Sequence, residues 1–160
     1  MYLSLHTTVA IATSNYLPNL WLAFIVNFIL HFVLDLIPHG DDEDSKKIIG
    51  DKTYNKTFIT ITLIDLLTSS AIIWYYAWTQ NFNVSTITSW SILGGVLPDL
   101  VMGFAFFAKL HPWIYKLNHW WTDKYLDFHK KIHFIIKFQM SKITALFLQA
   151  ATIVLIFWFI

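Results

Sequence analysis

The sequence predicts an all-α, polytopic membrane protein with about five transmembrane helices and one amphipathic helix in the membrane interface. Of its 160 residues, 56% are hydrophobic and only 13% are charged, whereas globular domains are about 45–50% apolar and about 25% charged. The chain also carries 14 Phe, 8 Trp and 7 Tyr, which suits rings lying in lipid and at its two interfaces. A soluble core of this length could not bury so much apolar surface.

Apolar runs near the length that crosses a bilayer, about 20 residues, predict the spans. They lie in a single domain, residues 1–160, and cover residues 2–17, 20–37, 57–78, 86–108 and 143–160. Pro18 and Pro38 end the first two because proline cannot continue a helix. Residues 39–56 form a charged loop, and residues 109–139 mix aromatic residues with lysine, as an interfacial helix does.

The lysines predict which side each loop faces. All eleven cationic residues are lysine, and they lie only in residues 46–56 and 109–142. The turns around residues 15–19 and 80–85 carry none. Because lysine favours the cytoplasmic side of a membrane, we expect the N-terminus and both charged segments inside and the C-terminus outside.

Composition excludes several functions. The chain has no cysteine, so disulfides, zinc–thiolate sites and thiol nucleophiles are ruled out. It also has no arginine to clamp a phosphate with two parallel hydrogen bonds. Its only glutamate, Glu43, is not part of a His-Glu-x-x-His protease motif. The net charge of +1 gives no reason to expect nucleic acid as a partner.

Two pairs of ionisable residues have a four-residue spacing, which places both side chains on one helix face. His31 and Asp35 form the first pair, inside a predicted span, where an ionised group costs about 2.5–3.5 kcal/mol at mid-membrane. That spacing suits two ligands of one metal ion, or a histidine with its orienting carboxylate. His129 and His133 form the second pair, where an amphipathic face at the headgroups is the competing interpretation.

Further ionisable groups fall near the predicted cytoplasmic half. His6, Asp65 and Asp99 lie in three other spans, and His39 and Asp41 lie at the adjacent surface. Asp65 could instead hydrogen-bond nearby threonines or cap a neighbouring broken helix, and Asp99 could cap the half-helix that follows a proline kink. We predict the following metal ligands: His6, His31, Asp35, His39, Asp99, His129 and His133. We predict Asp65 or Asp41 as the catalytic base.

These residues resemble a bacterial family of small inner-membrane proteins that are predicted metal-dependent hydrolases. An early His, a Leu-Pro-Asp-x-Asp-His stretch and a His-x-x-x-Asp pair are that family's proposed ligands; the matching positions here are His6, Asp99, His31 and Asp35. The resemblance covers about the first 100 residues and implies a multi-pass protein of the bacterial inner membrane. This chain departs from the pattern at Asn19, in its first Leu-Pro motif, lacks the Asp-His after Asp99, and lacks the family's His-Arg-Gly-x-Thr-His-Ser segment.

The leading hypothesis is a divalent-metal-dependent hydrolase that acts on a phosphoester in a lipid or lipid-linked substrate at the cytoplasmic face. Imidazole and carboxylate ligands suit zinc first, or manganese or iron, as one ion or as two about 3.5–4 Å apart. Membrane lipids are the expected partners, with Lys130 and Lys131 attracting anionic headgroups. The sequence leaves the oligomeric state open.

The alternative hypothesis is a non-enzymatic membrane protein, either an ion or proton transporter or a scaffold, whose buried His and Asp groups pair with one another. The predicted polar groups gather toward one face. The outer half, including residues 74–78 and 155–160, offers no polar relay. This distribution favours the hydrolase over the transporter.

Overall fold

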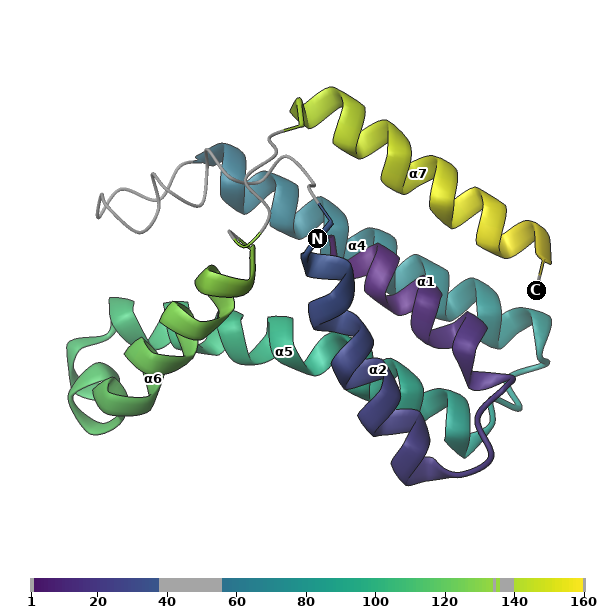
Figure 1. The fold of residues 1–160 in the computed structure, drawn as a ribbon, viewed down its shortest axis with the longest axis horizontal. Helices are drawn as coiled ribbons and strands as arrows, with labels where there is room; N and C mark the ends of the chain where they lie inside the picture. Colours follow the sequence, from purple (N-terminus) through teal and green to yellow (C-terminus); the bar gives the residue numbers. More distant parts are fainter. Residues whose placement is uncertain (1, 38–55, 134, 136–139, 160) are drawn as a thin grey trace.

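The structure is a computed structural model that describes residues 2–37, 56–133, 135 and 140–159 (Figure 1). These residues form α-helices and no strand, which confirms the predicted all-α class. The helices are α1 (Leu3–Ser14), α2 (Leu20–Asp35), α4 (Lys56–Thr79), α5 (Thr86–Leu110), α6 (Pro112–His133) and α7 (Lys142–Phe159). Apart from Lys56, which begins α4, the predicted charged loop of residues 39–56 lies outside the described residues.

Two of the described helices are long and apolar enough to cross a membrane, through Thr60–Thr79 in α4 and Thr86–Lys109 in α5. The apolar helices Leu20–Asp35 and Ile143–Trp158 are shorter. α1 has only 12 residues, so it extends about 18 Å against a hydrocarbon core of about 30 Å. The structure therefore identifies two of the five predicted spans by length and composition.

Side-chain caps set the starts of α2 and α5. The side chain of Asn19 accepts a hydrogen bond from the backbone N–H of Leu22, and that of Ser85 accepts one from the N–H of Thr88. Each satisfies a backbone donor that has no partner within its own helix. The turns that precede these two helices lie toward the same end of the bundle as the C-terminus, at the right of Figure 1.

The interior of the bundle is polar and its outside is apolar. α1 lies among α2, α4, α5 and α7, and its buried residues include Ser4, His6, Thr7, Thr8 and Ser14. Of the buried side chains in the described part of the chain, 14 are polar or charged and 8 are hydrophobic, and most of the latter are alanine. Large apolar side chains instead lie exposed along α4 and α7. This reverses the pattern of a water-soluble core and is typical of helices that pack through small and polar residues in lipid.

Two glycines let α5 approach its neighbours closely. A Cβ atom at Gly94 would overlap the backbone carbonyl of Phe24 in α2, and one at Gly95 would lie 3.2 Å from the Cβ of Ala10 and 3.3 Å from the carbonyl oxygen of His6. The helix axes can come this near only because neither position has a side chain. The close approach brings the backbone of α5 beside the histidines of α1 and α2.

We expect Gly94→Ala to separate α2 from α5 and to lower the stability by about 1–3 kcal/mol, the usual cost of overpacking. Gly103→Ala is the matched control in the same helix, because a Cβ there meets no atom within 4 Å and alanine gains up to about 1 kcal/mol of helix propensity. Thermal unfolding of both variants in detergent tests this prediction. Equal unfolding temperatures for the two variants would contradict it.

α6 packs along α5, and polar contacts hold it there at two places. Near the α5–α6 turn, Lys109 Nζ lies 2.8 Å from Asp123 Oδ1, and the Tyr115 hydroxyl donates a 2.7 Å hydrogen bond to Asp123 Oδ2. Further along, the Tyr125 hydroxyl donates a 2.7 Å hydrogen bond to the carbonyl oxygen of Pro98. These contacts hold the second half of α6 against the middle of α5.

The contacts of Asp123 predict a pH dependence of the stability. The Lys109 ammonium, and then the Tyr115 hydroxyl, hold the pKa of Asp123 below its usual range. A lowered carboxyl pKa contributes stability above the pKa of the unfolded chain, about 3.9, and that contribution is lost as the pH falls through the folded pKa. Because Asp123 is partly exposed, we expect Asp123→Asn to cost under about 1 kcal/mol at pH 7. Unfolding curves of both proteins should converge below pH 4, and a difference that persists there would contradict this account.

Candidate metal centre

The α2 helix presents one narrow polar face to the interior. Its buried residues are Ala23, Asn27, His31 and Asp35, which recur every four positions and so line one side of the helix. The other faces of α2 expose large apolar side chains. The predicted pair of His31 and Asp35 therefore lies inside the bundle and faces α1, α5 and α6.

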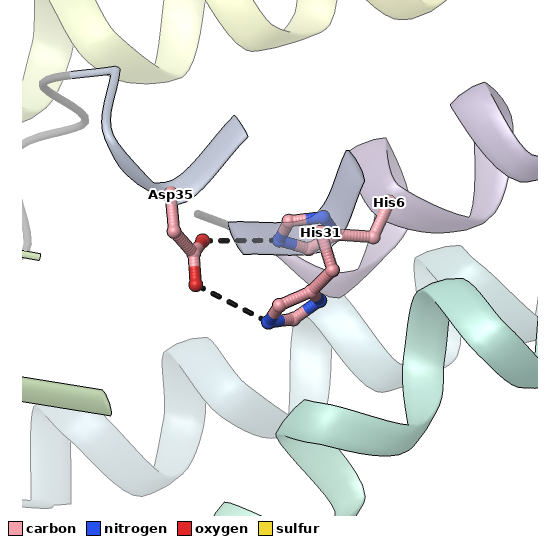
Figure 2. Close-up of side chains that lie close together, drawn as sticks. All are labelled: His6, His31 and Asp35. Atoms are coloured by element: carbon pink, nitrogen blue, oxygen red, sulfur yellow. Dashed lines mark hydrogen bonds and ion pairs between the residues drawn. The ribbon is translucent and has the colours of Figure 1, made fainter. Parts of the chain in front are cut away.

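Three histidines from three helices surround the carboxylate of Asp35. His6 Nε2 of α1 lies 3.2 Å from Oδ1, and His31 Nε2 lies 3.2 Å from Oδ2 (Figure 2). His129 Nε2 of α6 lies 3.3 Å from the same Oδ2. The rings of His6 and His31 stack with their centroids 4.0 Å apart. Three of the predicted ligands thus meet at a fourth, the buried carboxylate of Asp35.

The backbone of α5 fixes the protonation of one ring. His31 Nδ1 lies 2.8 Å from the carbonyl oxygen of Gly95, and a carbonyl can only accept, so Nδ1 carries the proton. Nε2 then faces Asp35 Oδ2, and it lies 3.7 Å from Asp99 Oδ1. Although it is fully buried, this Nε2 makes no hydrogen bond with any described residue. An imidazole whose second nitrogen donates to a carbonyl is the usual form of a metal-ligating histidine.

Two overlapping triads can hold a metal ion, and both include His31. One consists of His6, His31 and Asp35, and the other of His31, Asp99 and His129, with all ligand atoms of a triad within 4.8 Å of one another. The Asp99 side chain is 17% exposed, whereas the side chains of His6, His31 and Asp35 are 0% exposed. The cluster therefore opens toward the outside at Asp99.

The remaining predicted site residues lie elsewhere or outside the described part. Asp65 accepts backbone hydrogen bonds at both oxygens, from the N–H of Leu3 at 2.6 Å and of Ser4 at 3.0 Å. It thus caps a neighbouring helix, as one alternative interpretation held, although this helix, α1, is continuous and not broken; the role of Asp65 as a general base stays a prediction. His133 ends α6, but its side chain lies outside the described residues, as do His39 and Asp41.

The charge and spacing of the cluster suit a divalent cation. With both carboxylates ionised and the imidazoles neutral, the described cluster would carry a charge of −2, which a divalent cation would balance. Asp35 Oδ2 lies 3.2 Å from His31 Nε2 and 3.3 Å from His129 Nε2, and His31 Nε2 lies 3.7 Å from Asp99 Oδ1. Two ligand atoms of a tetrahedral ion with bonds of about 2.0–2.1 Å lie roughly 3.3–3.4 Å apart. Nitrogen and oxygen donors without sulfur fit zinc, manganese or iron.

Three groups near the cluster were not predicted. Asn27 lies one turn before His31 on the same face of α2, and Tyr125 lies one turn before His129 on α6; the four-residue spacing could have indicated both. The third is the carbonyl oxygen of Gly95, which holds His31. A backbone acceptor leaves no trace in the sequence, so only the helix packing reveals it.

The fold and the cluster define a helical protein with a buried histidine–carboxylate centre at the meeting point of four helices. Comparison of the chain with protein-family models, with curated proteins and with solved structures finds no match. The resemblance to the hydrolase family therefore stays a prediction, and the geometry of the centre carries the functional argument.

The Gly95 contact predicts the tautomer of His31. In protein with ¹⁵N-labelled histidine, we expect neutral His31 to carry its proton on Nδ1, with and without added zinc, because Nδ1 donates to the carbonyl in either state. Ring ¹⁵N NMR spectra, assigned with His31→Gln, test this prediction. A neutral His31 with its proton on Nε2 would contradict it.

Proposed function

We propose that the protein is a membrane-embedded, divalent-metal-dependent hydrolase that cleaves a phosphoester in a lipid or lipid-linked substrate at the cytoplasmic face. One observation carries the proposal: the buried Nε2 of His31 makes no hydrogen bond to a described residue, yet it faces Asp35 and Asp99 at 3.2 and 3.7 Å. A shared cation would bind this nitrogen and attract both carboxylates.

The centre suits one ion better than two. Both triads depend on His31, and its Nδ1 is committed to the carbonyl of Gly95. The single remaining nitrogen, Nε2, can bind only one ion. Zinc is our first choice because it accepts a mixed set of imidazole and carboxylate ligands at four positions.

The donor atoms divide into ligands and orienting groups. His31, His129 and Asp35 Oδ2 lie close enough together to be three ligands, and the fourth position, at the open side beside Asp99, would take a water molecule. His6 contacts the other oxygen of Asp35 at 3.2 Å, so it orients that carboxylate from outside the ligand set. Partners of this kind raise ligand basicity and fix geometry.

The chemistry follows from the open side of the centre. A bound ion would lower the pKa of a water molecule and polarise a phosphoryl oxygen. Asp99, as the most exposed of the carboxylates in the cluster, is placed to accept the proton of that water. The Tyr125 hydroxyl donates its proton to the neighbouring Pro98 carbonyl and so helps to fix α6 beside Asp99.

The surface of the bundle supports its placement in a membrane. α6 exposes Trp113, Leu117, Trp120 and Phe128 together with several lysines, as an amphipathic helix in the headgroup region does. The two lysine-free turns and the C-terminus share the opposite end of the bundle (Figure 1). We therefore infer that α1, α2 and α7 also lie within the bilayer, that the lysine-bearing end is cytoplasmic, and that a lipid substrate reaches Asp99 laterally between α5 and α6.

Elemental analysis of the purified protein tests the centre. We expect about one zinc, manganese or iron ion per chain, retained after dialysis, and its loss in His31→Ala and Asp35→Ala. The affinity should fall by more than the roughly 10–100-fold that outer partners contribute. His119→Ala is the control, since this exposed ring contacts its own helix α6, at the Lys116 carbonyl and the Tyr115 ring. Metal retained at full stoichiometry by His31→Ala would refute the assignment.

Activity tests the reaction class. The zinc-loaded protein in vesicles should release phosphate or a phosphorylated headgroup from lipid phosphoesters, and Asp99→Asn should lower kcat by about 10²-fold or more if Asp99 accepts the proton. His119→Ala should keep the wild-type rate. Wild-type turnover in Asp99→Asn would refute the role of Asp99 as proton acceptor. Metal-loaded protein that hydrolyses none of these lipids would refute the proposed hydrolase function.

One observation favours the transporter as a second candidate. At the far end of α1, Thr13 donates a 2.8 Å hydrogen bond to Asn27 and the hydroxyls of Ser14 and Thr88 lie 3.0 Å apart. These residues lie outside the apolar segments 74–78 and 155–160, from which we expected an outer half without a polar relay. The outer half therefore has more polar groups than expected. Metal-free wild-type protein that carries protons across vesicles, with loss of flux in Asp35→Asn, would establish this candidate in place of the hydrolase.

A further inference from the structure

We propose that Asp65 and Gln149 are positioning residues, which anchor the N-terminus of α1 inside the bundle and thereby hold His6 against the carboxylate of Asp35. Both residues come from helices that contribute no atom to the metal triads. The importance of this anchor for metal binding rests on the proposed function, whereas the anchor itself does not.

Side chains of two other helices accept hydrogen bonds from the first backbone N–H groups of α1. The Tyr2 N–H donates to Gln149 Oε1 of α7 at 3.0 Å. The N–H groups of Leu3 and Ser4 donate to Asp65 Oδ2 and Oδ1 of α4 at 2.6 and 3.0 Å. α1 has no side-chain cap of its own at Tyr2, so the start of this helix depends on α4 and α7.

A carboxylate is the right group for this position. The N-terminus of a helix carries a partial positive charge, and a carboxylate that accepts two backbone N–H groups forms charge-assisted hydrogen bonds. Asp65 lies within Thr60–Thr79, the part of α4 that could cross a membrane. At that depth no water replaces a lost hydrogen bond, which explains why an apolar helix keeps an aspartate there.

A second contact fixes the register of α1 on α4. The hydroxyls of Thr7 and Ser69 lie 2.6 Å apart, and each residue lies four positions after its counterpart in the pair of Leu3 and Asp65. Two contacts one helical turn apart on both helices set the height and the rotation of α1 together. His6 lies between them in sequence and extends to Asp35.

Gln149 gives α7 a role in the same anchor. α7 packs mainly on α1, with Ala145 and Gln149 buried while most of the helix exposes apolar side chains. Those two residues lie four apart, on the face that meets α1. The only buried polar side chain described in α7 therefore contacts the backbone that leads into His6.

This role differs from that of a general base. Both oxygens of Asp65 accept backbone hydrogen bonds, and Asp65 belongs to neither metal triad. Replacing Asp65 should therefore displace His6 and act on the centre only through His6. A catalytic Asp65 would instead affect turnover while leaving His6 in place.

The test compares Asp65→Leu and Asp65→Asn with the matched control Thr68→Ala, whose hydroxyl bonds only to its own helix at Ile64. In metal-free protein with ¹⁵N-labelled histidine, the His6 Nε2 resonance reports the contact with Asp35. We expect this resonance to shift to that of an unbonded ring in Asp65→Leu, to shift less in Asp65→Asn, which keeps one acceptor, and to stay unchanged in Thr68→Ala. An unchanged His6 resonance in Asp65→Leu or, should that variant not fold, in Asp65→Asn would overturn the proposal.

A double-mutant cycle with Co²⁺ as the probe tests the route. Asp65→Leu should weaken Co²⁺ binding by about 10–100-fold, as changes outside the ligand set do, but should have no further effect in a His6→Ala background. An equal loss in that background would show that Asp65 acts on the whole fold and would overturn the positioning role. If wild-type protein binds no Co²⁺, the proposed function fails, and the His6 resonance in metal-free protein still decides the anchor.

Discussion

A buried carboxylate is the constraint on which the rest of this structure depends. Asp35 is the last residue of α2, where the partial negative charge of the helix end disfavours a second negative charge, and its side chain is 0% exposed. Three imidazoles from α1, α2 and α6 surround it. Neutral imidazoles do not balance its charge and that of Asp99, so we propose that a bound cation or protonated rings do, and either answer ties three helices to one point.

The packing of the bundle brings the groups of this centre together. α1 is short, polar and largely buried, and the glycines of α5 let it lie close enough for His6 and a backbone carbonyl of α5 to reach the cluster. The outer helices carry large apolar side chains on their exposed faces. Polar groups inside and apolar groups outside suit a bilayer, where every buried donor and acceptor must find its partner within the protein.

The sequence predicted the helical class because apolar runs of about 20 residues indicate helices, and it predicted the pair of His31 and Asp35 because four-residue spacing is a local property. Predicting His6, Asp99 and His129 as ligands required a guess about depth, and the structure does bring them to the cluster. The partner of Asp65, the Gly95 carbonyl and the short length of α1 depend on how helices distant in sequence pack against each other. Residue spacing within one helix carries no such information. The apolar run of residues 2–17 also predicted a longer first helix than α1, which covers Leu3–Ser14.

Whether a cation or protons balance the centre is the central question, and X-ray absorption at the zinc edge of the zinc-loaded protein tests it most directly. We expect a first shell of nitrogen and oxygen at about 2.0–2.1 Å with multiple scattering from imidazole rings, and loss of that scattering in His31→Ala. A shell of oxygen alone, or a spectrum that His31→Ala leaves unchanged, would contradict the account.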